Sequence, residues 1–267
     1  FKPREYQNLI INQILDKPRT AIWAGMGMGK TSSTLTALET MYLAGESRPT
    51  LVLAPLRVCN STWPEEAHKW AHLTEIDVQP VTGDEKNRLA ALKRDASIYA
   101  CNYQNIPWLV DHYGAHWPFG TVVADESTRL KSFRLRQGGV RAQALAKVAH
   151  KNVKRFINLT GTPAPNGLQD LWGQTWFLDA GQRLGRTYSA FTDRWFCRTA
   201  DGFGRELRSQ SAADEIYNKL RDICLTIEAR DWFDLKEPIV KEIEVEMPRS
   251  ARRLYDQLKK DLILQIE

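Results

Sequence analysis

The chain has 267 residues, 43% hydrophobic and 26% charged, as expected of a globular protein with a large core, and its net charge of +5 favours an anionic partner. No apolar run is long enough to cross a bilayer, so no membrane partner is expected. No signal peptide is visible in the opening FKPREYQ, which begins without an initiator Met, so a removed leader stays an open alternative. The four cysteines include no CxxC pair, which argues against a zinc site or a disulfide framework and favours a reducing, cytoplasmic setting.

Short apolar runs alternate with amphipathic segments between residues 20 and 180. The predicted strands are 20–24, 50–55, 75–81, 96–101, 120–126 and 155–162, and the predicted helices are 30–45, 60–70, 84–95, 138–150 and 167–180. Ser61 or Thr62 is expected to cap the helix over 60–70, with Pro64 in its first turn. Strands that alternate with helices predict an α/β fold in which helices cover both faces of a mainly parallel sheet.

The pattern changes after Gly181. Residues 182–236 are rich in aromatic and charged side chains and show no clear strand. We expect one helix over 211–228, a strand within 236–247, and the beginning of another helix after residue 248. The α/β part is therefore expected to continue into a mainly helical C-terminal extension.

A glycine-rich segment, AGMGMGKT, lies between the first predicted strand and the helix that follows it. Backbone N–H groups at a helix start can surround a phosphate, and glycines let the main chain approach it closely. The pattern matches GxxxxGK[ST] except that Ala24 takes the place of the first glycine. The alternative is an ordinary glycine-rich turn before a helix. On the first interpretation Lys30 reaches the β- and γ-phosphates, Thr31 holds Mg²⁺, and the loop that cradles the phosphates consists of Gly25, Met26, Gly27, Met28 and Gly29.

Two adjacent acids, Asp125 and Glu126, end the predicted strand over 120–126. The carboxyl ends of parallel strands face the crevice in which open α/β sheets bind ligands. We expect Asp125 to bind Mg²⁺, and Glu126 to be the base that orients and activates the attacking water. Alternatively, the two acids begin a surface loop.

A third segment, LTGTPAPN, also follows an apolar strand. The hydroxyls of Thr160 and Thr162, on either side of Gly161, are suited to sense a γ-phosphate and to relay its presence to neighbouring segments. The alternative is a simple Gly-Pro turn.

These segments, in this order, resemble those of superfamily-two helicases, and most closely the Snf-type DNA translocases in their phage and bacterial versions. The resemblance rests on AGMGMGKT, LVLAPLRVCNSTWPEE, VVADEST and LTGTPAPNGLQDLWGQTWFLD, and it covers nearly the whole chain. The stretch DEST replaces the commoner DEAH-like box but keeps both acids. The resemblance implies a three-layer, RecA-like P-loop NTPase lobe over 1–180, a helical or irregular insertion over 181–236, and the beginning of a second lobe over 237–267.

The resemblance also implies residue roles. Gln7, in the sequence REYQ, would bind the adenine edge with Arg4 nearby, unless it is a solvated helix residue. Pro55, Leu56, Arg57, Asn102 and Tyr103 would lie along the nucleic-acid track. Trp63 is expected to pack rather than to stack on a base. Because the second lobe of such motors supplies an arginine finger, this chain by itself is expected to hydrolyse ATP poorly.

A basic stretch follows the two acids. Residues 129–155 contain nine Lys and Arg residues and no Asp or Glu. Side chains of this kind, including Arg134 and Arg136, provide sequence-independent contacts to nucleic-acid phosphates, or they form a solvated basic face. No base-reading module is present, so backbone recognition is expected, with DNA favoured over RNA by the resemblance alone.

The sequence therefore predicts a lobe that binds Mg²⁺ and ATP and couples hydrolysis to movement on DNA, in the cytoplasm of a bacterium or a phage-infected cell. Two alternatives remain at this point. One is a helicase subunit of a restriction or repair system, and the other is a nucleic-acid-binding module without ATP turnover.

Overall fold

The computed structural model describes residues 2–200, 204–233 and 244–264. The chain divides into two compact units, residues 1–233 and residues 234–267. The boundaries predicted at residues 180 and 236 stay predictions. Within the described residues no helix is both long and apolar enough to cross a membrane.

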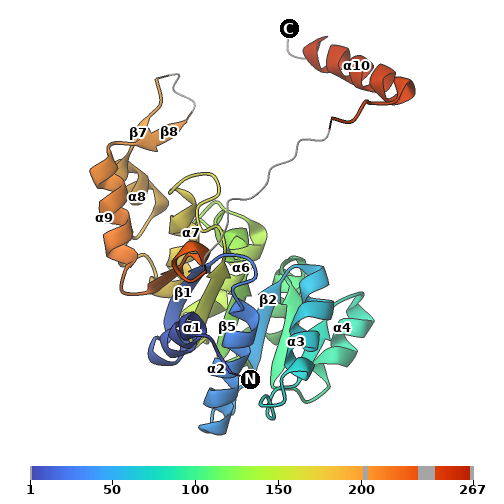
Figure 1. Cartoon of the computed structure of the whole chain (residues 1–267), viewed down its shortest axis with the longest axis vertical. Coiled ribbons are helices and arrows are strands. Elements are labelled where there is room, and N and C mark those ends of the chain that lie inside the picture. Colours follow the sequence, from blue (N-terminus) through green and yellow to red (C-terminus); the bar gives the residue numbers. More distant parts are fainter. Residues whose placement is uncertain (1, 201–203, 234–243, 265–267) are drawn as a thin grey trace. The chain divides into compact units, whose positions relative to one another are not determined.

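A sheet forms the centre of the first unit (Figure 1). It has seven strands in the order β3-β4-β2-β5-β6-β1-β9. Every pair of neighbouring strands is parallel. The central strands are buried over nearly their whole length because helices cover both faces, as the continuous apolar runs predict. The strands are β1 (Arg19–Ala24), β2 (Thr50–Ala54), β3 (Val78–Val81), β4 (Ile98–Asn102), β5 (Thr121–Asp125), β6 (Arg155–Thr160) and β9 (Cys224–Ile227).

The side chains of each strand alternate between two hydrophobic cores, one on each face of the sheet. One core joins alternate strand residues, such as Ile22 and Val123, to helices α1 (Glu5–Asp16), α2 (Lys30–Leu43) and α3 (Trp63–Lys69). The other core joins the intervening residues to α4 (Glu85–Leu92), α5 (Ile106–Tyr113), α6 (Val140–Ala149), α7 (Asp170–Asp179), α8 (Tyr188–Trp195) and α9 (Gln210–Leu220). The predicted three-layer α/β fold with a mainly parallel sheet is confirmed.

Two local predictions are wrong. Residues 211–228 do not form one helix, because α9 ends at Leu220 and the chain continues as β9, which pairs with β1. The pairing satisfies backbone groups of a β-branched segment at the sheet edge, and this tertiary contact outweighs the local helical pattern. The helix α3 has no side-chain cap, because residues 58–62 form a π-helix, η1 (Val58–Thr62), that leads directly into it.

Residues 182–236 also contain a short antiparallel pair, β7 (Phe196–Arg198) and β8 (Arg205–Leu207), which the sequence did not predict. Most of the strand predicted within 236–247 lies outside the described residues. The second unit contains α10 (Arg249–Leu264), which agrees with the helix predicted to begin after residue 248.

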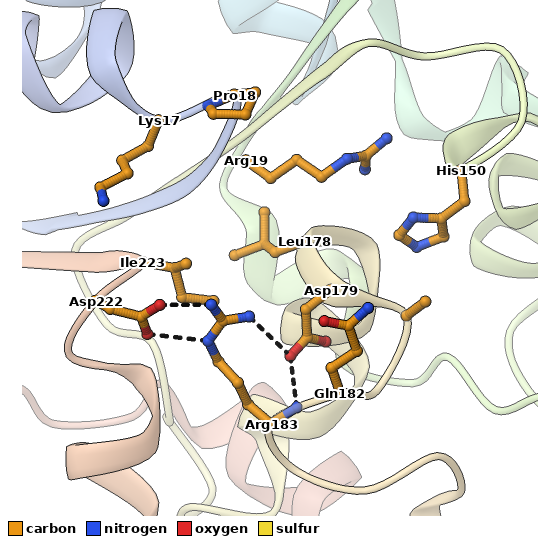
Figure 2. A pocket seen from close by; sticks show the side chains of 11 residues that line it. Lys17, Pro18, Arg19, His150, Leu178, Asp179, Gln182, Arg183, Asp222 and Ile223 are labelled. Atoms are coloured by element: carbon orange, nitrogen blue, oxygen red, sulfur yellow. Dashed lines mark hydrogen bonds and ion pairs between the residues drawn. The ribbon is translucent and has the colours of Figure 1, made fainter.

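The amino-terminal edge of the sheet is held by a charged junction around a cavity of about 380 Å³ (Figure 2). Arg183 donates from Nε and Nη2 to the carboxylate of Asp222, at 2.9 and 2.5 Å, and its backbone N–H donates to Asp179 at 2.8 Å. The guanidinium of Arg19 donates to three backbone carbonyls of α6, α7 and the loop before β6. Arg183 thus joins the end of α7 to the turn after α9, and Arg19 joins the beginning of β1 to α6 and α7. These contacts have a structural role at this edge of the sheet.

Candidate functional site

The residues that the sequence singled out lie at the carboxyl-terminal edge of the sheet. The parallel register places Asp125 beside Leu159, Thr160 beside Trp23, and Asn102 beside Ala54. The ends of β2, β4, β5, β6 and β1 therefore share one edge, with β6 between β5 and β1. The three segments predicted to carry the chemistry are thus adjacent in space.

The glycine-rich loop turns sharply between β1 and α2. Gly27 and Gly29 have φ angles of +75° and +68°, a conformation that side chains with a Cβ atom rarely adopt. Met28 is buried, whereas the side chain of Met26 is 94% exposed. Gly29 is the N-cap of α2, so the backbone N–H groups of the helix start face this edge. The predicted loop and helix start are therefore present, and phosphate binding stays a prediction.

Lys30 lies close to both acids. Its Nζ donates to the backbone carbonyls of Ala24 and Gly25, at 2.7 and 2.9 Å. Burial lowers the pKa of Lys30, and the negative charges of Asp125 and Glu126 partly oppose that effect. The ammonium group is therefore near enough to both carboxylates for their charges to act on it.

Asp125 is held by an unexpected donor. The indole Nε1 of Trp63 donates to its Oδ2 at 2.9 Å. Burial raises the pKa of Asp125, while the Trp63 hydrogen bond and the Lys30 charge oppose the rise. Among the described residues, no cluster of three or more His, Cys, Asp or Glu side chains is placed to hold a metal ion. A cation here would need oxygen atoms from its ligand as well as from Asp125.

Glu126 has the left-handed backbone conformation, with φ at +64°. Its Oε1 accepts hydrogen bonds from Thr128 Oγ1 at 2.5 Å and from Thr160 Oγ1 at 3.1 Å. Thr160 Oγ1 also accepts from the backbone N–H of Thr162 at 3.2 Å. The carboxylate is therefore fixed by its own turn and by the segment after β6.

Gln7 lies against the glycine-rich loop. Its Oε1 accepts from the backbone N–H of Arg4 at 2.9 Å, and a Cβ atom at Gly29 would lie only 2.2 Å from its Nε2. A cavity of about 380 Å³ opens here, and its lining includes Gln7, Thr31 and Trp70. The Arg4 guanidinium stacks over Phe233 at 5.0 Å from the ring centroid. The structure thus brings Gln7 beside the loop, whereas Arg4 packs on an aromatic ring.

The residues predicted to contact nucleic acid differ in accessibility. Leu56 is 51% exposed and Arg57 is also exposed, immediately after β2. Tyr103 is only 1% exposed and Asn102 is also buried, so these two side chains are not available for direct contact, and the place of this segment along the track stays a prediction. The Tyr103 hydroxyl instead donates to the backbone carbonyl of Asp125 at 3.0 Å.

The basic stretch contains both structural and exposed side chains. Arg155 donates to the carbonyls of Ile14 and Leu15, and Lys131 pairs with Asp170. Arg134 stacks on Tyr188 at 3.4 Å from the ring centroid and donates to two nearby carbonyls. Arg136 is exposed beside Arg134 and Tyr188, on a cavity of about 610 Å³. Only part of the stretch is therefore available to a partner.

Two site residues were missed by sequence reasoning. Trp63 does pack in the core, as expected, but its hydrogen bond to Asp125 was not foreseen. Gln174 is buried in α7 and accepts from Ser127 Oγ at 2.8 Å, while its amide nitrogen donates to the Pro163 carbonyl at 2.7 Å. It therefore joins the turn after the acids to the segment after β6. A lone glutamine within the apolar stretch LWGQTWFL was the available signal.

Comparison with known proteins gives a consistent result. A family model described as the SNF2-related domain matches residues 19–267. Putative protein p41 of Acyrthosiphon pisum secondary endosymbiont phage 1 is 58% identical over 271 residues, which cover all of this chain and 59% of that protein. Helicase SWR1 of Yarrowia lipolytica is 26% identical over 88% of this chain and 13% of its own length. The chain thus spans less than two thirds of these relatives.

Solved structures share the fold. The SWI2/SNF2 ATPase core of Sulfolobus solfataricus in complex with dsDNA matches with a TM-score of 0.66 and 23% identity, over 85% of this chain and 45% of that chain. The same core domain solved separately matches with a TM-score of 0.61 and 24% identity.

Proposed function

Because this chain belongs to the SNF2-related domain family, within the superfamily-two helicases, we propose that it is the first lobe of an ATP-driven DNA translocase. The observation that carries the proposal is that Lys30, Asp125 and Glu126 lie near one another at one sheet edge, beside a loop with two left-handed glycines. A helix start, a partly buried ammonium and two acids at one sheet edge are the parts that phosphoryl transfer requires.

The residues present fit Mg²⁺ and ATP. The N–H groups around Gly27 and Gly29 and the ammonium of Lys30 supply positive character for phosphates, and a cavity extends from them to Gln7. Thr31 and Asp125 would hold Mg²⁺, and Gln7 would contact the adenine. The bound cation would neutralise charge on the β- and γ-phosphates.

Glu126 is suited to the role of base. Its carboxylate already accepts from Thr160 and Thr128, which fixes the direction of its remaining lone pairs. A carboxylate fixed in this way orients a water molecule with little loss of entropy at the moment of reaction. The Thr160 hydrogen bond also connects the base to Gly161 and Thr162, which supports their role in coupling.

DNA is the proposed track. A solved relative of this fold is a complex with dsDNA, and the exposed side chains here that fit a phosphate backbone include Arg57 and Arg136. Movement would further require the second RecA-like lobe, with its arginine finger. We assign the protein to the cytoplasm of a bacterium or an infected host, since one relative is a phage protein.

The experiment that tests this function is a steady-state ATPase assay with single-stranded DNA, duplex DNA and RNA offered separately. We expect slow turnover that requires Mg²⁺ and that duplex DNA stimulates more than RNA. A helicase subunit of a restriction or repair system would also be stimulated by DNA, whereas an inert binding module would show no turnover with any of the three.

The exposed Arg136 should contribute to DNA affinity. We expect Arg136→Glu to weaken duplex binding and to reduce the slope of log affinity against log salt by about one to two, because one cation is lost and one anion is added. Fluorescence anisotropy over a range of KCl concentrations measures this slope. Arg155→Glu is unsuitable as a comparison because Arg155 holds α1 carbonyls, so the matched control is the exposed Lys86→Glu on α4. An unchanged slope for Arg136→Glu would remove this residue from the track.

A further inference from the structure

Trp63 links the exposed segment after β2 to Asp125 at the end of β5. Its side chain is 0% exposed, and its only hydrogen-bond donor points at Oδ2 of Asp125, 2.9 Å away. An indole N–H has no acceptor capacity and is costly to bury without a partner. The Asp125 carboxylate thus has one oxygen occupied by Trp63, and its orientation depends on where the indole lies.

The position of Trp63 is set by the exposed segment after β2. The backbone N–H of Cys59 donates to the Pro55 carbonyl at 3.0 Å, and the chain then continues through η1 into α3. Arg57, Thr62 and Trp63 all have right-handed helical backbone angles. Residues 56–63 therefore form one continuous helical segment directly after Pro55, and it carries exposed Leu56 and Arg57 at one end and the buried indole at the other. The π-helical turn within it is a rare feature that is common at functional sites.

A second contact fixes the main chain of the same acid. The Tyr103 hydroxyl donates to the carbonyl of Asp125 at 3.0 Å and lies 3.4 Å from that of Glu126. With its backbone held by Tyr103 and its side chain by Trp63, Asp125 has few ways to reorient. A displacement of the 56–63 segment would therefore reach the carboxylate mainly through the Trp63 hydrogen bond.

We propose that Trp63 is a positioning residue that orients the Asp125 carboxylate and transmits contacts made by Leu56 and Arg57 to it. The hydrogen bond is observed, and its consequence for nucleotide binding rests on the proposed function. Trp63 thus provides a mechanical route by which nucleic acid on the 55–57 segment changes the affinity of the site for Mg²⁺ and nucleotide. This coupling is reciprocal, so nucleotide must change DNA affinity by the same factor.

The first test observes the hydrogen bond directly. In protein labelled with ¹⁵N-tryptophan, the indole signal of Trp63 is assigned from through-bond experiments and from its loss in Trp63→Phe. We expect Asp125→Asn to move this signal upfield, because the charged acceptor is lost, and we expect duplex DNA to shift it in the wild type. The indole N–H of Trp117 is buried and has no acceptor within the described residues, so its signal is the internal control and should stay in place.

The second test measures the coupling. The affinity for ATPγS with Mg²⁺ is measured by calorimetry with and without duplex DNA, for the wild type, Trp63→Phe and Trp117→Phe. The quantity compared is the ratio of the ATPγS affinity with duplex DNA to the affinity without it. We expect this ratio to be the same in the wild type and in Trp117→Phe. In Trp63→Phe we expect a ratio of about one, with an unchanged affinity for DNA. Thermal unfolding of both variants checks that the loss of an indole has not unfolded either.

The outcomes separate the two proposals. The positioning role would be overturned if a folded Trp63→Phe variant keeps the wild-type ratio of ATPγS affinities. It would also be overturned if the Trp63 indole signal shifts neither in Asp125→Asn nor on addition of DNA. If the wild type binds no nucleotide, the proposed function fails, and the wild-type indole signal still decides whether DNA reaches the Trp63–Asp125 hydrogen bond. That measurement is made on the wild type with the signal assigned by through-bond experiments, so it also holds if Trp63→Phe does not fold.

Discussion

Glu126→Gln is expected to reduce ATP turnover by about 10²- to 10⁴-fold and to leave nucleotide affinity within a few-fold of the wild type. The amide is nearly the same size as the carboxylate, and its oxygen can still accept from Thr160 and Thr128. It has no basic lone pair for a proton of the attacking water, so the loss falls on the chemical step. Single-turnover hydrolysis, together with calorimetric nucleotide binding, separates the two quantities.

The matched control is Glu65→Gln, an identical change at an exposed glutamate in the first turn of α3. It should leave both turnover and affinity unchanged. If Glu126→Gln keeps wild-type turnover, Glu126 is not the base. If it loses nucleotide affinity as strongly as turnover, Glu126 contributes to binding rather than to the chemical step.

Lys30→Ala is expected to act on binding. Truncating one partner of a desolvated charge pair costs about 2–5 kcal/mol, which corresponds to an affinity loss of about 30- to 4,000-fold for Mg²⁺ and ATP. The variant also loses the hydrogen bonds of Nζ to the carbonyls of Ala24 and Gly25, which hold the loop. Calorimetric titration with ATPγS and Mg²⁺ measures the affinity, and thermal unfolding without ligand measures the effect on the fold.

Lys86→Ala, at an exposed lysine of α4, provides the comparison and should not change nucleotide affinity. A nucleic-acid-binding module that does not use ATP would be indifferent to Lys30→Ala as well. Equal affinities for the wild type and Lys30→Ala would therefore exclude the proposed phosphate loop.

The sequence predicted the parts of the molecule that depend on local pattern. Six strands and the helices α2, α3, α4, α6 and α7 follow from apolar periodicity, whereas α1 and α5 were not predicted. Parallel strand ends bring Lys30, Asp125 and Thr160 to one edge without further information. The glycines at positions 27 and 29 also matched their backbone requirement, since both have positive φ. These predictions share one property, namely that each needed only residues close together in the chain or a general rule for parallel sheets.

The remaining features depend on partners distant in sequence. The strand β9 forms because β1, some 200 residues earlier, offers an edge, which no local pattern reveals. The role of Arg134 depends on Tyr188, and the role of Trp63 depends on Asp125, which is 62 residues away. Tyr103 follows a strand end where an exposed contact was expected, but it packs in the core that contains α5 and α6. In each of these cases, a contact with a residue distant in the sequence determined the observed structure.

The left-handed backbone of Glu126 has a consequence for laboratory evolution. Only glycine, and to a lesser degree asparagine or aspartate, occupies this region at low cost, so Glu126→Gly would relieve backbone strain while it removes the hydrogen bonds that the carboxylate accepts from Thr128 and Thr160. The same change deletes the carboxylate on which the proposed catalysis depends. Heat selection alone therefore does not preserve turnover at this position, and libraries built on this scaffold need a paired selection for turnover.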